Sequence, residues 1–407
     1  MKMILDLFGL ALKNLKDRRT RSFLTVLGIF IGIAAIVALI SLSQGLQAGI
    51  SSQFNKLGAN KLIITGQSEN LGQPGQGVAI PLTLTDKDIV NKVNGVDIAI
   101  GILMRPVKLE YKNKIVYASI TSIPDDDAAR KKEIQDNQIE AAQGKILEKN
   151  KKDEVMIGAD FANQFFKKEI NVRDTIYIQG QPFKVVGVLK KADNLNIDTN
   201  LLMSESTMRE LLNVSDQYDV ITATAKTGQN LTKLKDSITR ALRQAKHEKV
   251  DEESFKVQTS EDIIKAFGNI LGILQIVLIG IAAISLVVGG IGVMNTMYTS
   301  VLERTREIGI MKSIGAKNSD ILLIFLFEAG FLGLVGGAIG VGLGIGIGKT
   351  FEVIGGSSIG FGLLKVYTPA WLIIGALAFA FIIGSLAGTL PAIRASKLKP
   401  VDALRYE

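Results

Sequence analysis

The chain has 407 residues, of which 47% are hydrophobic and 21% are charged, and its mean hydropathy is +0.28. It is too apolar for an ordinary soluble protein and too charged to lie wholly in lipid, so we expect membrane spans with one large water-exposed domain. The net charge of +8 fits the positive-inside rule better than nucleic-acid binding, because basic residues flank apolar segments. The lack of cysteine excludes disulfides and thiolate metal sites, and the single histidine, His247, argues against histidine-based metal clusters or triads.

The first apolar segment, residues 22–42, carries no charge and is long enough to cross a membrane. Basic residues precede it. Its apolar core is longer than that of a signal peptide, and no Ala-x-Ala site follows, so we interpret it as an uncleaved span. Upstream, apolar residues at helical spacing, among them Ile4, Phe8 and Leu12, predict an amphipathic helix on the cytoplasmic face.

A long polar segment, residues 45–259, alternates strand and helix patterns and predicts an external α+β domain. Turn residues at 112–114 and 179–181 predict two hairpins. Residues 70–77 predict a flexible surface loop. Three consecutive aspartates, 125–127, are calcium-ligand candidates, but they lack the glycine and distal glutamate of an EF-hand, so a polar loop is the better interpretation.

The second span is unusually long. Thr259, three residues before Asp262, predicts a helix start. The helix that follows is expected to reach about residue 299 and to be on the order of 60 Å long. This is about twice the thickness of the hydrocarbon layer, so its outer part is expected to form a stalk that enters the external domain. The polar residues Asn269 and Gln275 are consistent with a water-exposed outer part of this helix.

Lysine and arginine are concentrated in both terminal tails and in the loop at 303–317, so these parts are expected to be cytoplasmic. Trp371 stands where an interfacial aromatic anchor is expected. The predicted fold class is an α-helical integral protein of the cell membrane, with four transmembrane helices and a large extracytoplasmic α+β domain between the first two. In chain order we expect an amphipathic helix at 1–21, a span at 22–44, the external domain at 45–259, the stalk and second span at 260–299, a cytoplasmic helix at 300–318, a third span at 319–348, an external loop at 349–369, a fourth span at 370–391 and a cytoplasmic tail at 392–407.

Glycines in the third span predict helix packing rather than nucleotide binding. Gly348, Lys349 and Thr350 suggest a phosphate loop, but Leu343 stands where that motif requires glycine, and the segment is a lipid-length apolar helix. Small residues every four positions let transmembrane helices approach closely. The predicted packing face is formed by Gly336, Gly340, Gly344 and Gly348, with shorter faces at Gly28 and Gly32 and at Gly384 and Gly388.

Glu328 is the only ionisable residue well inside the third span. A carboxylate in lipid is costly, so a functional or paired state is expected. Because it lies roughly 12 Å from the cytoplasmic start of the span, a structural bond near the interface, to Asn295 or to a basic terminal residue, is an equally good interpretation. Glu328 therefore remains a possible intramembrane polar site.

The loop between the second and third spans carries more charged residues, and a clearer helical spacing, than a loop that only joins two spans needs. Its spacing predicts a short amphipathic helix, with a turn at Gly315 and Ala316 and with Asn318 or Ser319 capping the next helix. Such a helix suits docking into the groove of a partner. The candidate docking residues are Glu303, Arg304, Arg306, Glu307, Ile308, Gly309, Met311, Gly315 and Ala316.

Several segments resemble the MacB/FtsX-type ABC transporter permeases, and in particular the MacB branch. They are ERTREIGIMKSIGAKNSDI, FLFEAGFLGLVGGAIG, the carboxyl-terminal TLPAIRASKLKPVDALRYE, the amino-terminal NLKDRRTRSFLTVLGIFIGIAAIVAL and the external FKVVGVL. The resemblance covers the whole chain. It implies four spans per subunit, a homodimer or paired permease, an external domain like the MacB periplasmic core, and a separate ATPase docked on a coupling helix at 300–318.

Unlike MacB, the sequence has no ATPase domain before the first span and no phosphate loop. ATP and magnesium are therefore expected in a partner ATPase, with no cofactor, metal or catalytic residue in this chain. The resemblance predicts that the permease couples ATP hydrolysis to movement of its external domain, for substrate export or extraction. Membrane lipid is the remaining expected partner, and nucleic acid is not one.

Two other functions remain as alternatives. An FtsX-like scaffold would regulate an external enzyme without transport, although the large external domain favours export. A membrane-embedded enzyme is disfavoured, because cysteine and paired intramembrane acids are missing and the one histidine is external.

Overall fold

The computed structural model describes residues 19–404, except 59, 68–79, 150, 165–169, 193 and 359–365. The predicted amphipathic helix lies largely outside the described residues, as do the predicted loop at 70–77 and part of the loop at 349–369. The described residues form two compact units. One is a helical unit drawn from residues 19–46, 269–355 and 366–404, and the other is an inserted domain drawn from the described residues of 47–268 and from 356–358.

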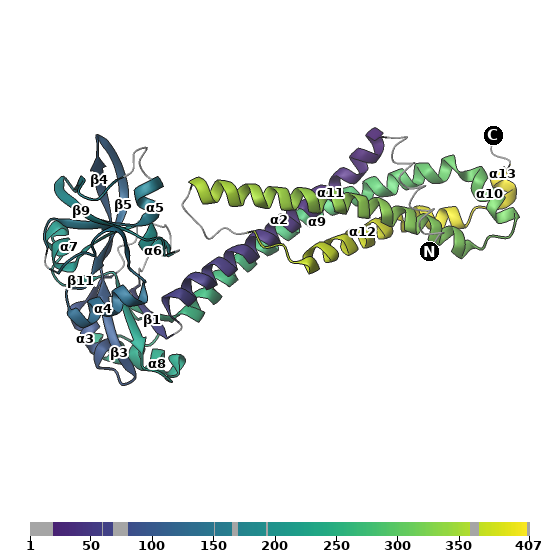
Figure 1. The fold of residues 1–407 in the computed structure, drawn as a ribbon. Coiled ribbons are helices and arrows are strands. Elements are labelled where there is room, and N and C mark those ends of the chain that lie inside the picture. Colours follow the sequence, from purple (N-terminus) through teal and green to yellow (C-terminus); the bar gives the residue numbers. More distant parts are fainter. Residues whose placement is uncertain are drawn as a thin grey trace. The chain divides into compact units, whose positions relative to one another are not determined.

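Four long apolar helices dominate the chain (Figure 1), and each is long and apolar enough to cross a membrane. They form because a segment surrounded by lipid must satisfy every backbone polar group internally, which a helix does. The helices are α2 (Arg19–Leu57), α9 (Ser260–Glu303), α11 (Asn318–Ser358) and α12 (Ala370–Ser396). The short α10 (Thr305–Ser313) lies between α9 and α11, and the short α13 (Pro400–Leu404) follows α12. The predicted fold class, four spans with an α+β domain between the first two, is confirmed.

The helices that contain the third and fourth predicted spans are longer than those spans. Helix α11 continues past residue 348 to Ser358, and α12 continues past Pro391 to Ser396. Pro391 lies inside α12, where it has no N–H to donate to the carbonyl of Ala387 and its ring crowds that carbonyl. Membrane helices tolerate such a proline because neighbouring groups satisfy the freed carbonyl. The predicted start of α9 is confirmed, because Thr259 and Asp262 exchange side-chain to backbone hydrogen bonds of 3.0 and 3.1 Å. With 44 residues, α9 is about 66 Å long.

The inserted domain contains two main sheets. The four-stranded sheet has the order β13-β1-β12-β3, and all its pairings are antiparallel. In the larger sheet the order is β6-β9-β7-β10-β5-β4-β8, and β8 also pairs with β9, which closes six of the seven strands into a ring. The strands are β1 (Lys61–Gly66), β2 (Leu82–Thr83), β3 (Val96–Ile102), β4 (Met104–Tyr111), β5 (Lys114–Ile123), β6 (Ala141–Gly144), β7 (Glu154–Ile157), β8 (Thr175–Ile178), β9 (Gln181–Leu189), β10 (Leu201–Ser204), β11 (Gln217–Tyr218), β12 (Val220–Ala225) and β13 (Phe255–Thr259).

Both predicted hairpins are present. The β4–β5 hairpin turns at Lys112 and Asn113, which have φ of 48° and 63°. The β8–β9 hairpin turns at Gln179 and Gly180, with φ of 50° and 80°. Two successive positive φ values match the right-handed twist of the flanking strands, which is why asparagine and glycine are favoured in such turns.

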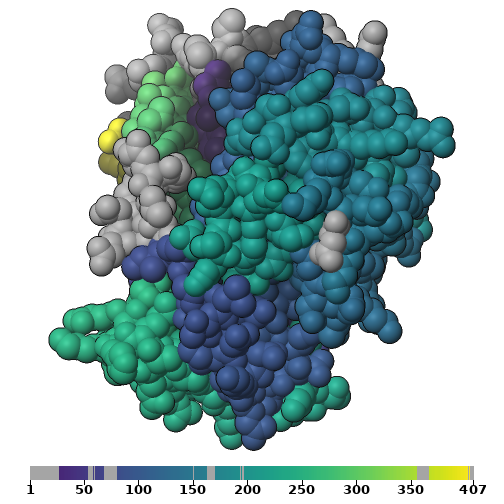
Figure 2. Space-filling model, turned by 90° about the vertical axis from the view of Figure 1, so that its left-hand side faces the viewer, coloured from purple at the N-terminus to yellow at the C-terminus, as the bar shows by residue number. Residues whose placement is uncertain are grey.

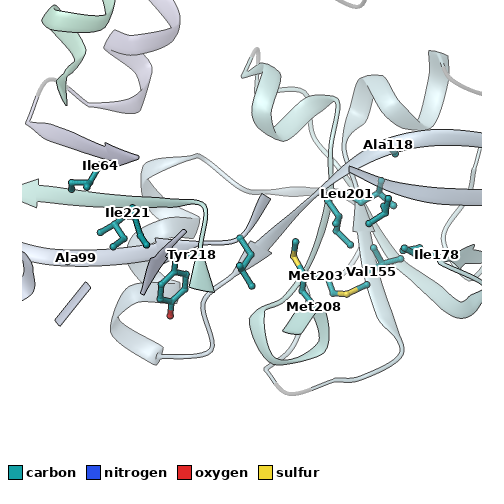
Figure 3. Packing of buried hydrophobic residues seen from close by; sticks show 14 of the residues in the cluster. Ile64, Ala99, Ala118, Val155, Ile178, Leu201, Met203, Met208, Tyr218 and Ile221 are labelled. Carbon is teal, nitrogen blue, oxygen red and sulfur yellow. The ribbon is translucent and has the colours of Figure 1, made fainter. Parts of the chain in front are cut away.

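One hydrophobic core joins the two sheets of the inserted domain. Figure 3 shows Ile64, Ala99 and Ile221 of the smaller sheet and Val155, Ile178 and Leu201 of the larger one as parts of the same buried cluster. Figure 2 shows the blue and teal segments of this domain closely packed at one face. The helices of the domain are α3 (Leu84–Lys92), α4 (Asp127–Asp136), α5 (Ala159–Gln164), α6 (Leu195–Asp198), α7 (Glu205–Leu212) and α8 (Leu231–Lys246).

Candidate functional site

The candidate site is the short helix α10, which follows α9 after a single non-helical residue. That residue, Arg304, has φ −103° and ψ 14° and interrupts the helix after Glu303. The hydroxyl of Thr305 donates to the carbonyls of Val301 and Leu302, at 3.0 and 2.8 Å. A buried side chain therefore closes the bend, and the direction of α10 is fixed relative to the end of α9.

The inner face of α10 packs into the helical unit. Ile308 is completely buried, Gly309 is buried and Met311 is half-buried, and Ile308 belongs to a core that includes Val301, Phe325 and other residues of the long helices. Ile308 and Gly309 were predicted as docking residues. The structure instead places them in the interior, where they hold α10 against its own chain.

Arg304 forms an ion pair with Glu328. Nη1 of Arg304 lies 3.2 Å from Oε2 and 3.5 Å from Oε1 of the glutamate. The two side chains are 26% and 15% exposed. The partner suggested by the sequence was Asn295 or a basic terminal residue, and Arg304 was not considered. The pair satisfies the carboxylate inside α11 with a cation from the α9–α10 bend, as a charge near lipid requires.

A second connection joins α10 to the chain after α12. Nζ of Lys312 donates to the carbonyls of Ser396 and Leu398, at 2.6 and 2.7 Å. These carbonyls lie at the end of α12, where helical acceptors are left without N–H donors. Helix α13 also packs against α10. Lys312 was not predicted, because a lysine that donates to backbone carbonyls leaves no periodic pattern in the sequence.

The predicted turn after α10 is confirmed. Gly315 has φ 103°, and the N–H of Ala316 donates to the carbonyl of Met311 at 3.0 Å, which is a glycine-terminated helix end. The start of α11 differs from the prediction. The carboxylate of Asp320, rather than Asn318 or Ser319, accepts from the N–H of Lys317 at 3.0 Å.

The outer face of α10 is exposed and mixes charged with large apolar residues. Ile310 is 48% exposed and Ile314 is 82% exposed. Arg306, Ile310 and Ile314 lie four residues apart and so form one ridge. Glu307 is exposed beside this ridge, as is Glu303 at the end of α9. We call Arg306, Glu307, Ile310 and Ile314 the outer ridge. Ile310 and Ile314 were absent from the predicted docking residues.

The predicted glycine face of α11 packs against α2 over part of its length. A Cβ at Gly340 would meet the carbonyl oxygen of Phe30 at 2.7 Å, and one at Gly344 would meet that of Ala34 at 2.8 Å. Gly336 is buried. At Gly348 the nearest neighbour is Val366, at 3.4 Å, which belongs to the segment before α12. The backbones of α2 and α11 approach closely only where no side chain intervenes.

Two further glycine contacts complete the bundle. The face of α11 that packs on α12 includes Gly333 and Gly337, which were not predicted from the sequence. A Cβ at Gly333 would collide with the carbonyl oxygen of Ala380. Gly28 of α2 packs on Gly289 of α9, where a Cβ would meet the Cα at 2.6 Å. Each of these contacts ties one long helix to a neighbour.

The polar candidates in the inserted domain have structural roles. Asp126 caps α4 by accepting from the N–H of Ala129 at 2.9 Å, Asp125 accepts from the N–H of Ser206 at 2.8 Å, and Asp127 pairs with Lys149. His247 ends α8 with φ 56°. Across the residues that the structure describes, no group of three potential metal ligands occurs.

Comparison with known proteins agrees with this architecture. Residues 22–241 match the MacB-like periplasmic core domain, and residues 279–400 match the FtsX-like permease C-terminal domain. The uncharacterized ABC transporter permease MJ1507 of Methanocaldococcus jannaschii is 35% identical, over 99% of this chain and 98% of that protein. The uncharacterized ABC transporter permease YknZ of Bacillus subtilis is 30% identical, over 99% of this chain and 100% of that protein.

A third relative is longer. The macrolide export ATP-binding/permease protein MacB of Campylobacter fetus is 33% identical over 98% of this chain, which spans 61% of that protein. The first domain match alone covers more than half of the 407 residues. The chain therefore belongs to the MacB/FtsX-type family of ABC transporter permeases.

Proposed function

We propose that this permease couples ATP hydrolysis by a separate ATPase subunit to movement of its inserted domain, which exports or extracts a substrate. In this proposal the outer ridge of α10 binds the ATPase on the cytoplasmic side, and the inserted domain lies on the opposite side. The permease itself binds no nucleotide. MJ1507 and YknZ support a separate ATPase, because both are described as permeases and match this chain over 98–100% of their length.

The observation that carries the proposal is the exposure of Ile310 and Ile314 beside Arg306 and Glu307. Large apolar side chains on an exposed helix ridge, flanked by charges of both signs, fit the groove of a partner protein. The inner face of the same helix is fully packed by Ile308. The inner face of α10 therefore packs against its own chain, and the outer face is left to bind a partner.

The contacts around α10 suit the transmission of a displacement. Arg304 ties the helix to α11, Lys312 ties it to the end of α12, and Thr305 ties it to the end of α9. A push on the outer ridge would reach all three spans, because packed helices shift as rigid elements. Helix α9 continues without interruption to Ser260, which lies in the inserted domain. It is the element that would carry the movement there.

A photo-crosslinking amino acid in place of Ile314 tests the docking surface. We expect it to capture a polypeptide with a nucleotide-binding phosphate loop, identified by mass spectrometry. The same amino acid at Ile115, which is 54% exposed in β5 of the inserted domain, should not capture that subunit. Capture at both positions, or only of lipid at Ile314, would contradict the assignment.

Export and signalling are separated by a second experiment on the intact permease and its ATPase. If the complex exports a substrate, an ATPase variant that binds but does not hydrolyse ATP will make cells accumulate compounds that wild-type cells clear. A scaffold would leave accumulation unchanged and alter the activity of an external enzyme instead.

A further inference from the structure

An apolar groove lies between α9 and α12 in the helical unit. Its volume is about 410 Å³. The floor is formed by small residues, since a Cβ at Gly290 would lie 3.6 Å from the Cβ of Ala387. Its walls include Val287, Ile291, Leu386 and Leu390, which are exposed apolar side chains. The groove therefore opens outward along two membrane spans.

The length of the groove matches one acyl chain. Its lining residues extend over positions 283–294 of α9 and 379–390 of α12. At the helical rise per residue, each of these stretches is about 16 Å long. One leaflet of a bilayer is about 15 Å of hydrocarbon, or half of the roughly 30 Å core. An extended acyl chain of one leaflet would thus fill the groove from end to end.

One end of the groove carries a cation. Arg394 lies one helical turn beyond Leu390, and Tyr298 lies one turn beyond Met294. The guanidinium carbon of Arg394 is 4.9 Å from the centroid of the Tyr298 ring. This contact uses the flat face of the guanidinium, so its N–H edges stay available to donate to an anion. Arg394 and nearby Lys397 are both exposed.

We propose that this groove binds one acyl chain of an anionic phospholipid, whose phosphate is held by Arg394. The apolar walls contact the acyl chain. The positive charge of Arg394 complements the negative phosphate, at the level where a lipid headgroup lies. A second copy of the permease fits less well. If a second copy occupied the groove about a two-fold axis passing beside it, the Arg394 side chains of both copies would approach each other at the same level, and like charges repel.

The test uses the full-length permease reconstituted into phosphatidylcholine vesicles. Trace spin-labelled phosphatidylglycerol or phosphatidylcholine with identical chains reports the immobilised fraction by electron paramagnetic resonance. We expect wild-type protein to prefer phosphatidylglycerol about fivefold, which is the effect of one basic residue near a membrane surface. Arg394→Gln should abolish the preference while phosphatidylcholine still associates. Ala387→Phe, which fills the groove, should reduce association of both lipids.

Two variants serve as controls. Lys317→Gln removes an exposed positive charge away from the groove, and Ile284→Phe adds bulk to α9 at an exposed position that does not line it. Both should behave as wild type. If Ala387→Phe fails to fold, Gly290→Leu fills the groove from α9 instead. The proposal is overturned if Arg394→Gln keeps the fivefold preference, or if the groove-filling variants change the oligomeric state and leave lipid association intact. The latter result would identify a second copy as the occupant.

Discussion

Nη1 of Arg304 lies 3.2 Å from Oε2 of Glu328, and this ion pair joins the bend between α9 and α10 to the interior of α11. Only 15% of the glutamate side chain is exposed. A carboxylate in such a place is stable only when it is paired, so the two helices cannot separate without exposing a charge to an apolar environment. The pair is the first of the connections that hold α10 in position.

Arg304→Gln should destabilise the permease by about 1–3 kcal/mol, because the Glu328 carboxylate then loses a charged hydrogen-bond donor. Thermal unfolding of the intact protein in detergent measures the change. Arg306→Gln removes the same charge from the exposed outer ridge and should cost less than about 0.5 kcal/mol. Equal costs for the two variants would show that the ion pair contributes nothing specific.

Lys312→Met should loosen α13. The variant keeps a long apolar side chain but loses both hydrogen bonds to the carbonyls of Ser396 and Leu398. Hydrogen bonds from a charged donor contribute about 1.5–3 kcal/mol, so amide hydrogen exchange in residues 396–404 should accelerate roughly 10- to 100-fold. Lys317→Met, on the exposed turn after α10, is the control. It should leave amide hydrogen exchange in residues 396–404 unchanged.

Gly344→Ala should weaken the contact between α2 and α11. Its Cβ would lie 2.8 Å from the carbonyl oxygen of Ala34 and 3.0 Å from the Cβ of Val37, and overpacking of this kind costs about 1–3 kcal/mol. Gly346→Ala is a matched control two residues away, where a Cβ meets no atom within 4 Å. It should be neutral, or stabilising by up to about 1 kcal/mol. Thermal unfolding measures the stability of both variants. A Gly346→Ala variant less stable than Gly344→Ala would contradict the packing role.

Glu133→Gln should stabilise the inserted domain at neutral pH. Burial raises the pKa of the Glu133 carboxyl, while nearby Lys61 opposes the shift. Because the folded pKa is higher than the unfolded one, the carboxyl contributes a cost that grows as pH rises above the unfolded value of about 4.3. Glutamine avoids this cost and still accepts from Nδ2 of Asn137, which lies 2.7 Å from Oε1 of Glu133.

Calorimetry of the intact permease measures this effect. The unfolding transition of the inserted domain should rise by roughly 2–4 °C at pH 7. The gain should disappear near pH 3, about one pH unit below the unfolded pKa, where the carboxyl is protonated in both states. Glu140→Gln, at an exposed carboxylate paired with Lys190, should change little at either pH. A gain that stayed the same at both pH values would contradict the explanation.

The sequence predicted the elements that depend on local pattern. Apolar length predicted the four spans, and the spacing of Thr259 and Asp262 predicted the start of α9. Turn residues such as Asn113 and Gly180 predicted the hairpins, because only a few residue types tolerate positive φ. These signals lie within a few residues of each other, so no knowledge of distant contacts was needed.

The candidate site was predicted less completely, because its geometry depends on contacts between distant segments. A helical wheel places Ile308 and Ile310 on nearly opposite faces of α10, but it does not tell which face is buried. Packing against the long helices decides that Ile308 is buried and Ile310 is exposed. Likewise, the partners of Glu328 and Lys312 are 24 and 84 or more residues away. Neither pairing follows from spacing along the chain.

ATPase stimulation by the reconstituted permease tests the central claim most directly. The ATPase subunit captured through Ile314 is assayed with wild-type permease, with the double variant Ile310→Asp, Ile314→Asp, and with Ile115→Asp as a control for the same chemical change elsewhere. Burying an unpaired carboxylate in an apolar contact is costly, so we expect the double variant to lose stimulation by at least about tenfold while it remains folded. The control should stimulate as wild type does. Full stimulation by the double variant would show that the outer ridge of α10 is not where ATP hydrolysis is coupled to the permease.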